Sequence, residues 1–199
     1  MIIKNKYASI VVHKVISKAY PVVQQWTAPD APSADGILAS TLLTTAVQVI
    51  TSGITNPDFP RILAVDSDGA ATGNVVIIGT NIRGETITDT IALNGTNAVA
   101  GVKAFKTIKS IQLPVKAAAE SVWVGWTDKL GLQSIPVSTT VISETTTNQA
   151  DTGGAVLTRD SDEIEKCLYD PTTECNATAD KTIVYISVEQ PTKVAGYTE

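Results

Sequence analysis

Few residues of this 199-residue chain are of the types that carry out catalysis. The only histidine is His13, and the chain has no Gly-x-Ser-x-Gly segment or comparable setting for a nucleophile. General acid-base catalysis needs titratable groups that converge in a pocket, and a hydrolytic triad needs a base beside its nucleophile. Two carboxylate pairs, Asp66 with Asp68 and Glu163 with Glu165, are close in sequence and lie in predicted turns, where solvated acids are normal. The sequence therefore predicts no catalytic residue, and we expect a protein that is not an enzyme and uses no cofactor.

One acidic segment has the spacing of a metal site. Asp66, Asp68 and Gly69 resemble the opening of a calcium-binding loop. The later ligands of such a loop, including its closing glutamate, do not follow. We interpret the segment as a hairpin turn in which Asp and Gly adopt left-handed conformations, and we predict no metal site.

The two cysteines, Cys167 and Cys175, lie eight residues apart around the turn at Asp170-Pro171. A disulfide between them would close a short loop, for which chain entropy gives a stabilisation of roughly 2 to 3 kcal/mol. Two free thiols are an equally good interpretation for a chain made in a cytoplasm. Metal binding by the pair is disfavoured because no histidine lies near it in sequence.

The elements that would position these residues are clearest between Asn74 and Leu113. Val75 to Ile78 is an uninterrupted apolar run, typical of a strand covered on both faces, whereas Thr86 to Leu93 alternates and predicts a strand covered on one face. Its predicted inner face carries Ile87, Asp89, Ile91 and Leu93, and threonines occupy the outer face. With a third strand ending at Leu113, the stretch is a predicted β-meander. We expect an all-β, antiparallel β-sandwich, Ig-like or jelly-roll-like, with an extended N-terminal arm.

Two residues fall out of phase with the predicted core. In the third strand Ile108 is out of step with Phe105, Ile111 and Leu113, which predicts a bulge or a second covered face. The strand Ser121 to Trp126 places Trp123 on the face opposite to Trp126. A large apolar side chain that the core cannot hold often marks a contact, so Ile108 and Trp123 are predicted partner contacts.

The C-terminal third contains an acidic run and a last predicted strand. The run at 160–165, DSDEIE, is interpreted as a solvated turn, with the alternative that it accepts lysines of the N-terminal arm. The strand is predicted from Lys181 to Glu189. Its predicted buried side carries Thr182, Val184, Ile186 and Val188.

The N-terminal region differs in charge from the rest of the chain. We divide the chain into an arm with its linker, residues 1–36, and a β-sandwich domain, residues 37–199, because residues 27–36 have a linker composition of Pro, Ala, Ser, Asp and Gly. The first 29 residues contain no acid and four lysines, Lys4, Lys6, Lys14 and Lys18. They carry +4, and the remainder carries −5 − 4 = −9. These lysines are predicted to contact an acidic neighbour, including another copy of the chain, and simple solvation is the alternative.

Composition excludes several other partners. A net charge of −5 without a cluster of Lys and Arg interleaved with aromatics predicts no binding to nucleic acid. No segment has the roughly 18 to 20 apolar residues that a membrane-spanning helix needs. The apolar segment Ile10 to Ile16 is interrupted by His13 and Lys14 and predicts no secretory signal, so we expect synthesis in a cytoplasm.

Several linked motifs carry a family resemblance. They are the segment SGITNPDFPRILAV, then VVIIGTNIRGETITDTIALNGTNAVAGVKAFKTIKSIQLP, then WVGWTDKLGL. This series, over roughly residues 50 to 135, resembles a pattern that recurs in structural proteins of tailed bacteriophages. The chain departs from it in having Trp126-Thr127 before Asp128, where a glycine is expected.

The resemblance implies a virion protein made in the host cytoplasm, with a capsid decoration or accessory head protein as the first interpretation. Its implied partners are the major capsid protein or other virion proteins, and we expect a homo-oligomer. The alternatives are a tail, neck or fibre component, or a carbohydrate-binding β-sandwich module in which a tryptophan stacks on sugar. The resemblance transfers no catalytic residue.

Overall fold

The computed structural model describes residues 19–115, 119–147, 149–151 and 153–188, and these residues form fourteen strands and one short 3-10 helix, with no α-helix among them. In chain order the elements are β1 (Tyr20–Trp26), β2 (Ser33–Leu42), β3 (Gln48–Ile50), β4 (Arg61–Ser67), β5 (Asn74–Thr80), β6 (Thr86–Ala92), β7 (Val99–Phe105), β8 (Thr107–Leu113), β9 (Ser121–Gly131), β10 (Ser143–Thr146), β11 (Gln149–Ala150), β12 (Val156–Thr158), η1 (Ile164–Lys166), β13 (Leu168–Asp170) and β14 (Lys181–Ser187). All pairings between strands are antiparallel. The predicted all-β, sandwich-like fold is confirmed.

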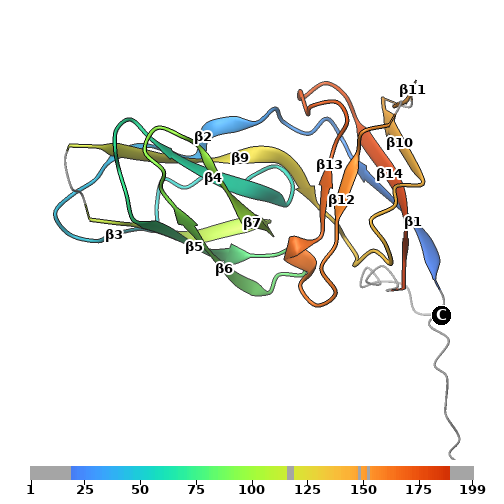
Figure 1. The fold of residues 1–199 in the computed structure, drawn as a ribbon, viewed down its shortest axis with the longest axis horizontal. Helices are drawn as coiled ribbons and strands as arrows, with labels where there is room; N and C mark the ends of the chain where they lie inside the picture. The colour runs from blue at the N-terminus through green and yellow to red at the C-terminus, as the bar shows by residue number, and fades with distance from the viewer. Residues whose placement is uncertain (1–18, 116–118, 148, 152, 189–199) are drawn as a thin grey trace, which may run out of the picture.

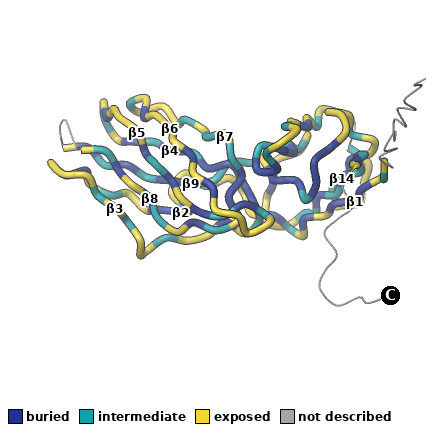
Figure 2. The backbone as a smooth tube through the Cα atoms, turned by 90° about the horizontal axis from the view of Figure 1, so that it is seen from below, coloured by how far each residue is buried: buried dark blue, intermediate teal, exposed yellow. Residues whose placement is uncertain are grey.

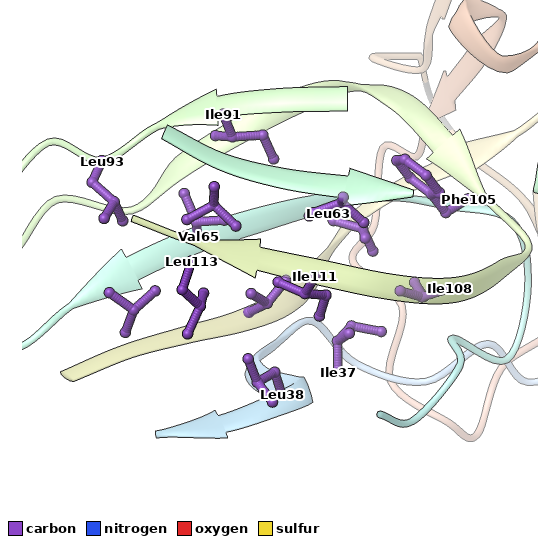
Figure 3. Close-up of a cluster of buried hydrophobic side chains, with 14 of the residues drawn as sticks. Ile37, Leu38, Leu63, Val65, Ile91, Leu93, Phe105, Ile108, Ile111 and Leu113 are labelled. Carbon is purple, nitrogen blue, oxygen red and sulfur yellow. The ribbon is translucent and has the colours of Figure 1, made fainter. Parts of the chain in front are cut away.

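Eight strands form the larger of two lobes, here called the sandwich lobe. One layer has the order β2-β9-β4-β7 and the other β3-β8-β5-β6. The two inner faces fill one apolar core, shown in Figure 3. Its fully buried members include Leu63, Val65, Phe105, Ile111 and Leu113.

The alternation in β6 is confirmed, and it explains why an acid faces inward. Ile87, Asp89 and Ile91 are buried, and the threonines between them are exposed. The Asp89 carboxylate accepts hydrogen bonds from the backbone N–H groups of Val102 (2.8 Å) and Lys103 (3.2 Å) on β7. Since β7 is an edge strand of its sheet, Asp89 satisfies donors that the sheet leaves unpaired and closes this corner of the sandwich.

The structure corrects the predicted β-meander. The predicted third strand is two strands, because the chain crosses at Lys106 from β7 in one layer to β8 in the other. The crossing passes so close to β5 that a Cβ added at Gly79 would lie 2.0 Å from the carbonyl oxygen of Thr107. The predicted bulge is present, since the register of β8 against β5 shifts between Ile78 and Gly79. Ile78 is 37% exposed, so β5 is covered on one face and not on both.

The second lobe, here called the end lobe, shares β9 with the sandwich lobe. The first half of β9 pairs with β2, its last residues pair with β13, and β4 pairs along its other edge. Figure 1 shows this long strand running along the molecule from one lobe towards the other. The sheet β1-β14-β10-β11, here called the end sheet, covers β12, β13 and the end of β9. Figure 2 shows buried backbone inside both lobes.

The end lobe has a core of its own. Trp26 of β1 stacks on Tyr169 of β13 with ring centroids 5.1 Å apart, and both side chains are fully buried. The buried amide of Gln24 crosses between the layers: it donates to the carbonyl of Gly131 (3.1 Å) and accepts from the N–H of Gln133 (2.9 Å). An apolar contact and a buried, hydrogen-bonded amide thus join the end sheet to the end of β9.

The two lobes also meet at the β5–β6 turn, within the stretch that carries the family resemblance. Asn81 accepts from the N–H groups of Arg83 (2.9 Å) and Glu85 (3.1 Å), which shapes the turn. Ile82 at its tip packs against the core of the end lobe. Asn81 also donates to Glu165 of η1 (3.3 Å), so the turn is a bridge between the lobes.

The structure corrects the predicted domain boundary after Gly36, which falls inside β2. The predicted linker is fixed to the body by three consecutive carbonyls. Those of Pro29, Asp30 and Ala31 accept from the N–H of Ala177 (2.8 Å), from Arg61 (2.8 Å) and from the Trp126 indole (2.9 Å). With β1 paired along β14, residues 19–36 belong to the folded body.

Arg61, at the start of β4, lies where the lobes join and is fully buried. Its Nε and Nη2 donate to the two carboxylate oxygens of Asp58 at 2.7 and 2.9 Å. Nη2 also donates to Asp30 O, and Nη1 donates to the carbonyl of Thr127 on β9 at 3.2 Å. The planar guanidinium therefore holds the β1–β2 connection, β4 and β9 in one arrangement.

We expect Arg61→Met to destabilise the chain by about 3 kcal/mol, because it leaves a carboxylate and two carbonyls without their donor. Urea unfolding followed by circular dichroism measures the change. Lys106→Met, at an exposed basic residue between β7 and β8, is the control and should change the free energy of unfolding by less than about 0.5 kcal/mol. Equal effects of the two substitutions would contradict the role given to Arg61.

Candidate partner-binding surface

The predicted partner contacts are not brought together. Lys4, Lys6, Lys14 and Lys18 lie outside the described residues. Ile108 is a correction: it is 8% exposed and packs in the core of the sandwich lobe, because the bulge in β8 turns it inward (Figure 3). Trp123 is half-buried, and its neighbours in sequence, Val122 and Val124, are fully buried on the opposite face of β9.

The other tryptophan of this strand is occupied within the chain. Trp126 packs against the sandwich core, and its indole N–H donates to the carbonyl of Ala31. Its ring lies on Gly36, where an added Cβ would come within 2.4 Å of it. Gly36 and Trp126 thereby fit β2 onto β9. Of the two tryptophans of β9, only Trp123 remains a candidate for contact with a partner protein.

Both cysteines are buried and are not joined by a disulfide, so the structure favours the second of the two predicted alternatives. The thiol of Cys167 donates to the carbonyl of Asp160 (3.2 Å). The backbone N–H of Cys175 donates to Asp128 (2.8 Å). Burial, and then the hydrogen bond to the Asp128 carboxylate, raise the pKa of the Cys175 thiol to about 12, so this thiol stays protonated at neutral pH.

Thiol labelling checks the two cysteines. We expect iodoacetamide, added without reductant, to label neither cysteine of the folded chain and to add two labels after unfolding in urea. Burial and protonation both slow alkylation of the native thiols. Treatment with reductant should leave the labelled mass unchanged, and a chain that gains two labels only after reduction would show a disulfide instead.

The pKa of Cys175 gives a pH dependence with a defined sign. Its pKa is raised in the folded state from an ordinary value of 9.0, so folding favours the protonated thiol. The stabilisation is present below pH 9 and is lost as the pH rises from 9 towards 12. In urea unfolding at a series of pH values, the native chain should lose stability over this range more steeply than Cys175→Ser. Parallel curves would contradict the assignment.

The acidic run at 160–165 makes contacts within the chain. Glu163 pairs with Lys103 (3.1 Å) and Lys166, and hydrogen bonds from Lys166 and then Lys103 lower its pKa. Glu165 is buried and lies 3.6 Å from Lys103. Lys103 and Lys166 already pair with these carboxylates. The geometry therefore gives no support to the prediction that the acidic run binds lysines of the N-terminal arm.

The turn after β4 is not the predicted hairpin with left-handed Asp and Gly: β4 and β5 lie in different sheets, Asp66, Asp68 and Gly69 have no positive φ, and the segment holds loops together. Asp68 accepts from the N–H of Ser121 (2.7 Å), and the Ser67 hydroxyl donates to the carbonyl of Gly95 (2.6 Å). Among the described residues, no three His, Cys, Asp or Glu side chains lie close enough together to hold a metal ion.

The most buried carboxylate of the end lobe is also used in hydrogen bonds. Glu144 is 6% exposed, and it accepts from the Tyr169 hydroxyl (2.5 Å) and from both the N–H (2.9 Å) and the hydroxyl (2.5 Å) of Thr172. Burial and this contact raise the pKa of Tyr169. Glu144 borders a hollow of about 430 Å³, where Asp151 accepts from the Thr146 hydroxyl. Glu144 thus holds β10 against the segment after β13, and Asp151 joins the end of β11 to the end of β10.

The facing of β14 is the largest correction to the sequence-based prediction. Thr182, Val184 and Ile186 point outward, and the buried residues are Lys181, Ile183, Tyr185 and Ser187. The observed face buries the larger apolar groups, and its polar members have partners. The Tyr185 hydroxyl lies 2.9 Å from that of Ser134, Lys181 donates to the carbonyl of Thr173 (2.5 Å), and Ser187 donates to that of Ile135 (2.8 Å).

The outward residues form what is here called the outer apolar face, made of Pro21, Val23, Val137, Val184 and Ile186. Pro21 is paired with Ile186, whose carbonyl accepts from the N–H of Val137 (2.7 Å), and Val23 is paired with Val184. Val23 is 63% exposed and Val137 is 44% exposed. At the other end of the same face the row is polar, with Gln25 and Thr182 paired. A contiguous apolar surface bordered by polar groups is typical of a protein-binding site.

The sequence contains a signal for this face that the predicted alternation hides. Residues 183–186 read IVYI, an uninterrupted apolar run of the kind found in strands covered on both faces. The described residues bury the inner face of β14 and cover its outer face only in part, since Val184 and Ile186 are half-buried.

No protein-family model matches the chain, and no curated protein and no solved structure is significantly similar to it. The described residues include no helix that is long and apolar enough to cross a membrane.

Proposed function

We propose that this chain is a structural protein of a tailed-bacteriophage virion, a decoration or accessory head protein that binds the assembled shell and reinforces it. The resemblance of residues 50 to 135 to phage structural proteins supports the family of function. The outer apolar face is the observation that carries the proposal. It presents five apolar residues from three segments on one sheet, at the end-lobe end of the molecule (Figure 1).

The architecture suits a protein that persists in an assembly. Every buried polar side-chain atom among the described residues has a hydrogen-bond partner, and the buried charges of Arg61, Lys181 and Glu144 each contact several groups. Full satisfaction of buried polar groups makes a chain rigid, and a rigid surface loses little entropy on binding. Binding would depend on buried apolar area, since exposed ion pairs contribute little.

The proposal is tested on particles. The coding sequence is expressed in its native setting, phage particles are purified by density gradient, and their proteins are measured by mass spectrometry. We expect peptides of this chain in the particles at an amount comparable to the major shell protein. Gold labelling of an epitope-tagged chain should then decorate the head. Label on the tail or neck would show that the chain is a tail or neck component and not a head protein. Absence of the chain from purified particles would refute the proposed function.

A further inference from the structure

We infer that the outer apolar face binds residues 1–18 of a second copy of this chain, in a reciprocal exchange between two copies. This inference rests on the proposed function, because it names the first partner of the surface that carries it. Four observations lead to it: the size of the face, the composition of residues 1–18, the place where they join β1, and the distribution of charge.

The face by itself is too small for a stable interface. β1 and β14 have seven residues each, which gives a length of about 23 Å, and four strands give a width of about 19 Å. The projected area of the whole end sheet, of which the outer apolar face is a part, is therefore at most about 400 Å², whereas stable interfaces bury about 800 Å² per partner. In a reciprocal exchange each copy contributes one face and one segment, so the buried area is doubled and approaches the usual size.

The N-terminal segment has the composition that such a face requires. Seven of its 18 residues are Ile or Val: Ile2, Ile3, Ile10, Val11, Val12, Val15 and Ile16. Ile3, Tyr7, Val11 and Val15 also recur every four positions, as on one face of a helix. Eighteen residues span about 27 Å as a helix and up to about 60 Å when extended, so either form covers the length of β1.

The join between the segment and β1 favours a second copy over the segment's own sheet. The apolar rows of the face lie at the start of β1, next to residue 19. To cover them in its own copy, the chain would have to reverse sharply just before Tyr20. Residues 14–20 contain no Gly, Asn, Asp or Pro, and Ser17 is the one residue among them of a type that tight turns favour. Pro21 restricts Tyr20 to extended conformations, so the chain cannot reverse at Tyr20 itself.

Charge favours the same arrangement. The segment carries +4 and no acid, and the rest of the chain carries −9. Two acidic bodies repel each other, and each inserted segment places four lysines against the body of the other copy. This attraction also raises the rate at which two copies meet.

The test begins with the mass of the full chain by sedimentation equilibrium. We expect at least twice the 20.9 kDa of one chain. Val184→Lys on the face and Val11→Lys in the segment should each reduce the mass to that of one chain. The control, Thr88→Lys, places the same charge on an exposed outward position of β6 in the sandwich lobe and should leave the mass unchanged. If Val184→Lys does not fold, Val23→Lys on the edge strand β1 replaces it.

A photo-cross-link identifies the occupant. Copies with p-benzoylphenylalanine at Val23 are mixed with ¹⁵N-labelled copies that lack it, and cross-linked peptides are identified by mass spectrometry. We expect peptides from residues 1–18 that carry ¹⁵N, since they come from the second copy. Cross-links to unlabelled segments only would show that each segment covers its own sheet, and this would overturn the inference.

Two further outcomes separate this inference from the proposed function. A chain that has the mass of one copy, with no cross-link to residues 1–18, overturns the inference even if the protein is present in purified particles. A chain that exchanges segments and is absent from particles keeps the inference and refutes the virion role. A multimer whose mass Val184→Lys and Val23→Lys leave unchanged shows that another surface joins the copies, and it also overturns the inference.

Discussion

The buried guanidinium of Arg61 fixes the arrangement on which the rest of the structure depends. It is the point at which the β1–β2 connection, the start of β4 and the middle of β9 meet, and all of its described contacts are to groups that need a donor. A lysine could not replace it, since a single ammonium group cannot reach a carboxylate and two carbonyls in different directions. The placement of β1 follows, and with it the position of the end sheet relative to the sandwich lobe.

The polar groups of the end lobe have a common role. Gln24, Glu144 and Lys181 each reach from one segment to another that is distant in sequence, and each is buried. Apolar packing alone would leave the register of short strands such as β10 and β13 weakly specified. Buried hydrogen bonds penalise any register that leaves these groups without partners, so they select one arrangement of the lobe. The same reasoning accounts for Asp89 in the sandwich lobe, which fixes β6 against β7.

Sequence patterns predicted the fold class and the facing of β6 because strict alternation has one interpretation. They failed where two arrangements satisfy the same pattern. The crossing at Lys106 does not disturb the apolar pattern of the predicted third strand, so β7 and β8 looked like one element. Residues 27–36 have the composition of a linker, but their fixed position comes from carbonyl contacts to distant residues that composition cannot show. In β14 both faces are apolar, and the choice between them depended on the partners of Lys181, Tyr185 and Ser187. The outer apolar face was hidden for the same reason.

The pairing of β9 has a mechanical consequence. Because one continuous strand is hydrogen-bonded to β2 at one end and to β13 at the other, with β4 along much of its opposite edge, a pull that separates the lobes along β9 acts parallel to the strand. Such a load shears many backbone hydrogen bonds at once, whereas a load across the strand would open them one after another. Tension along the molecule is therefore carried by β9 through both lobes. Under such a load we expect the two lobes to unfold together and not one after the other.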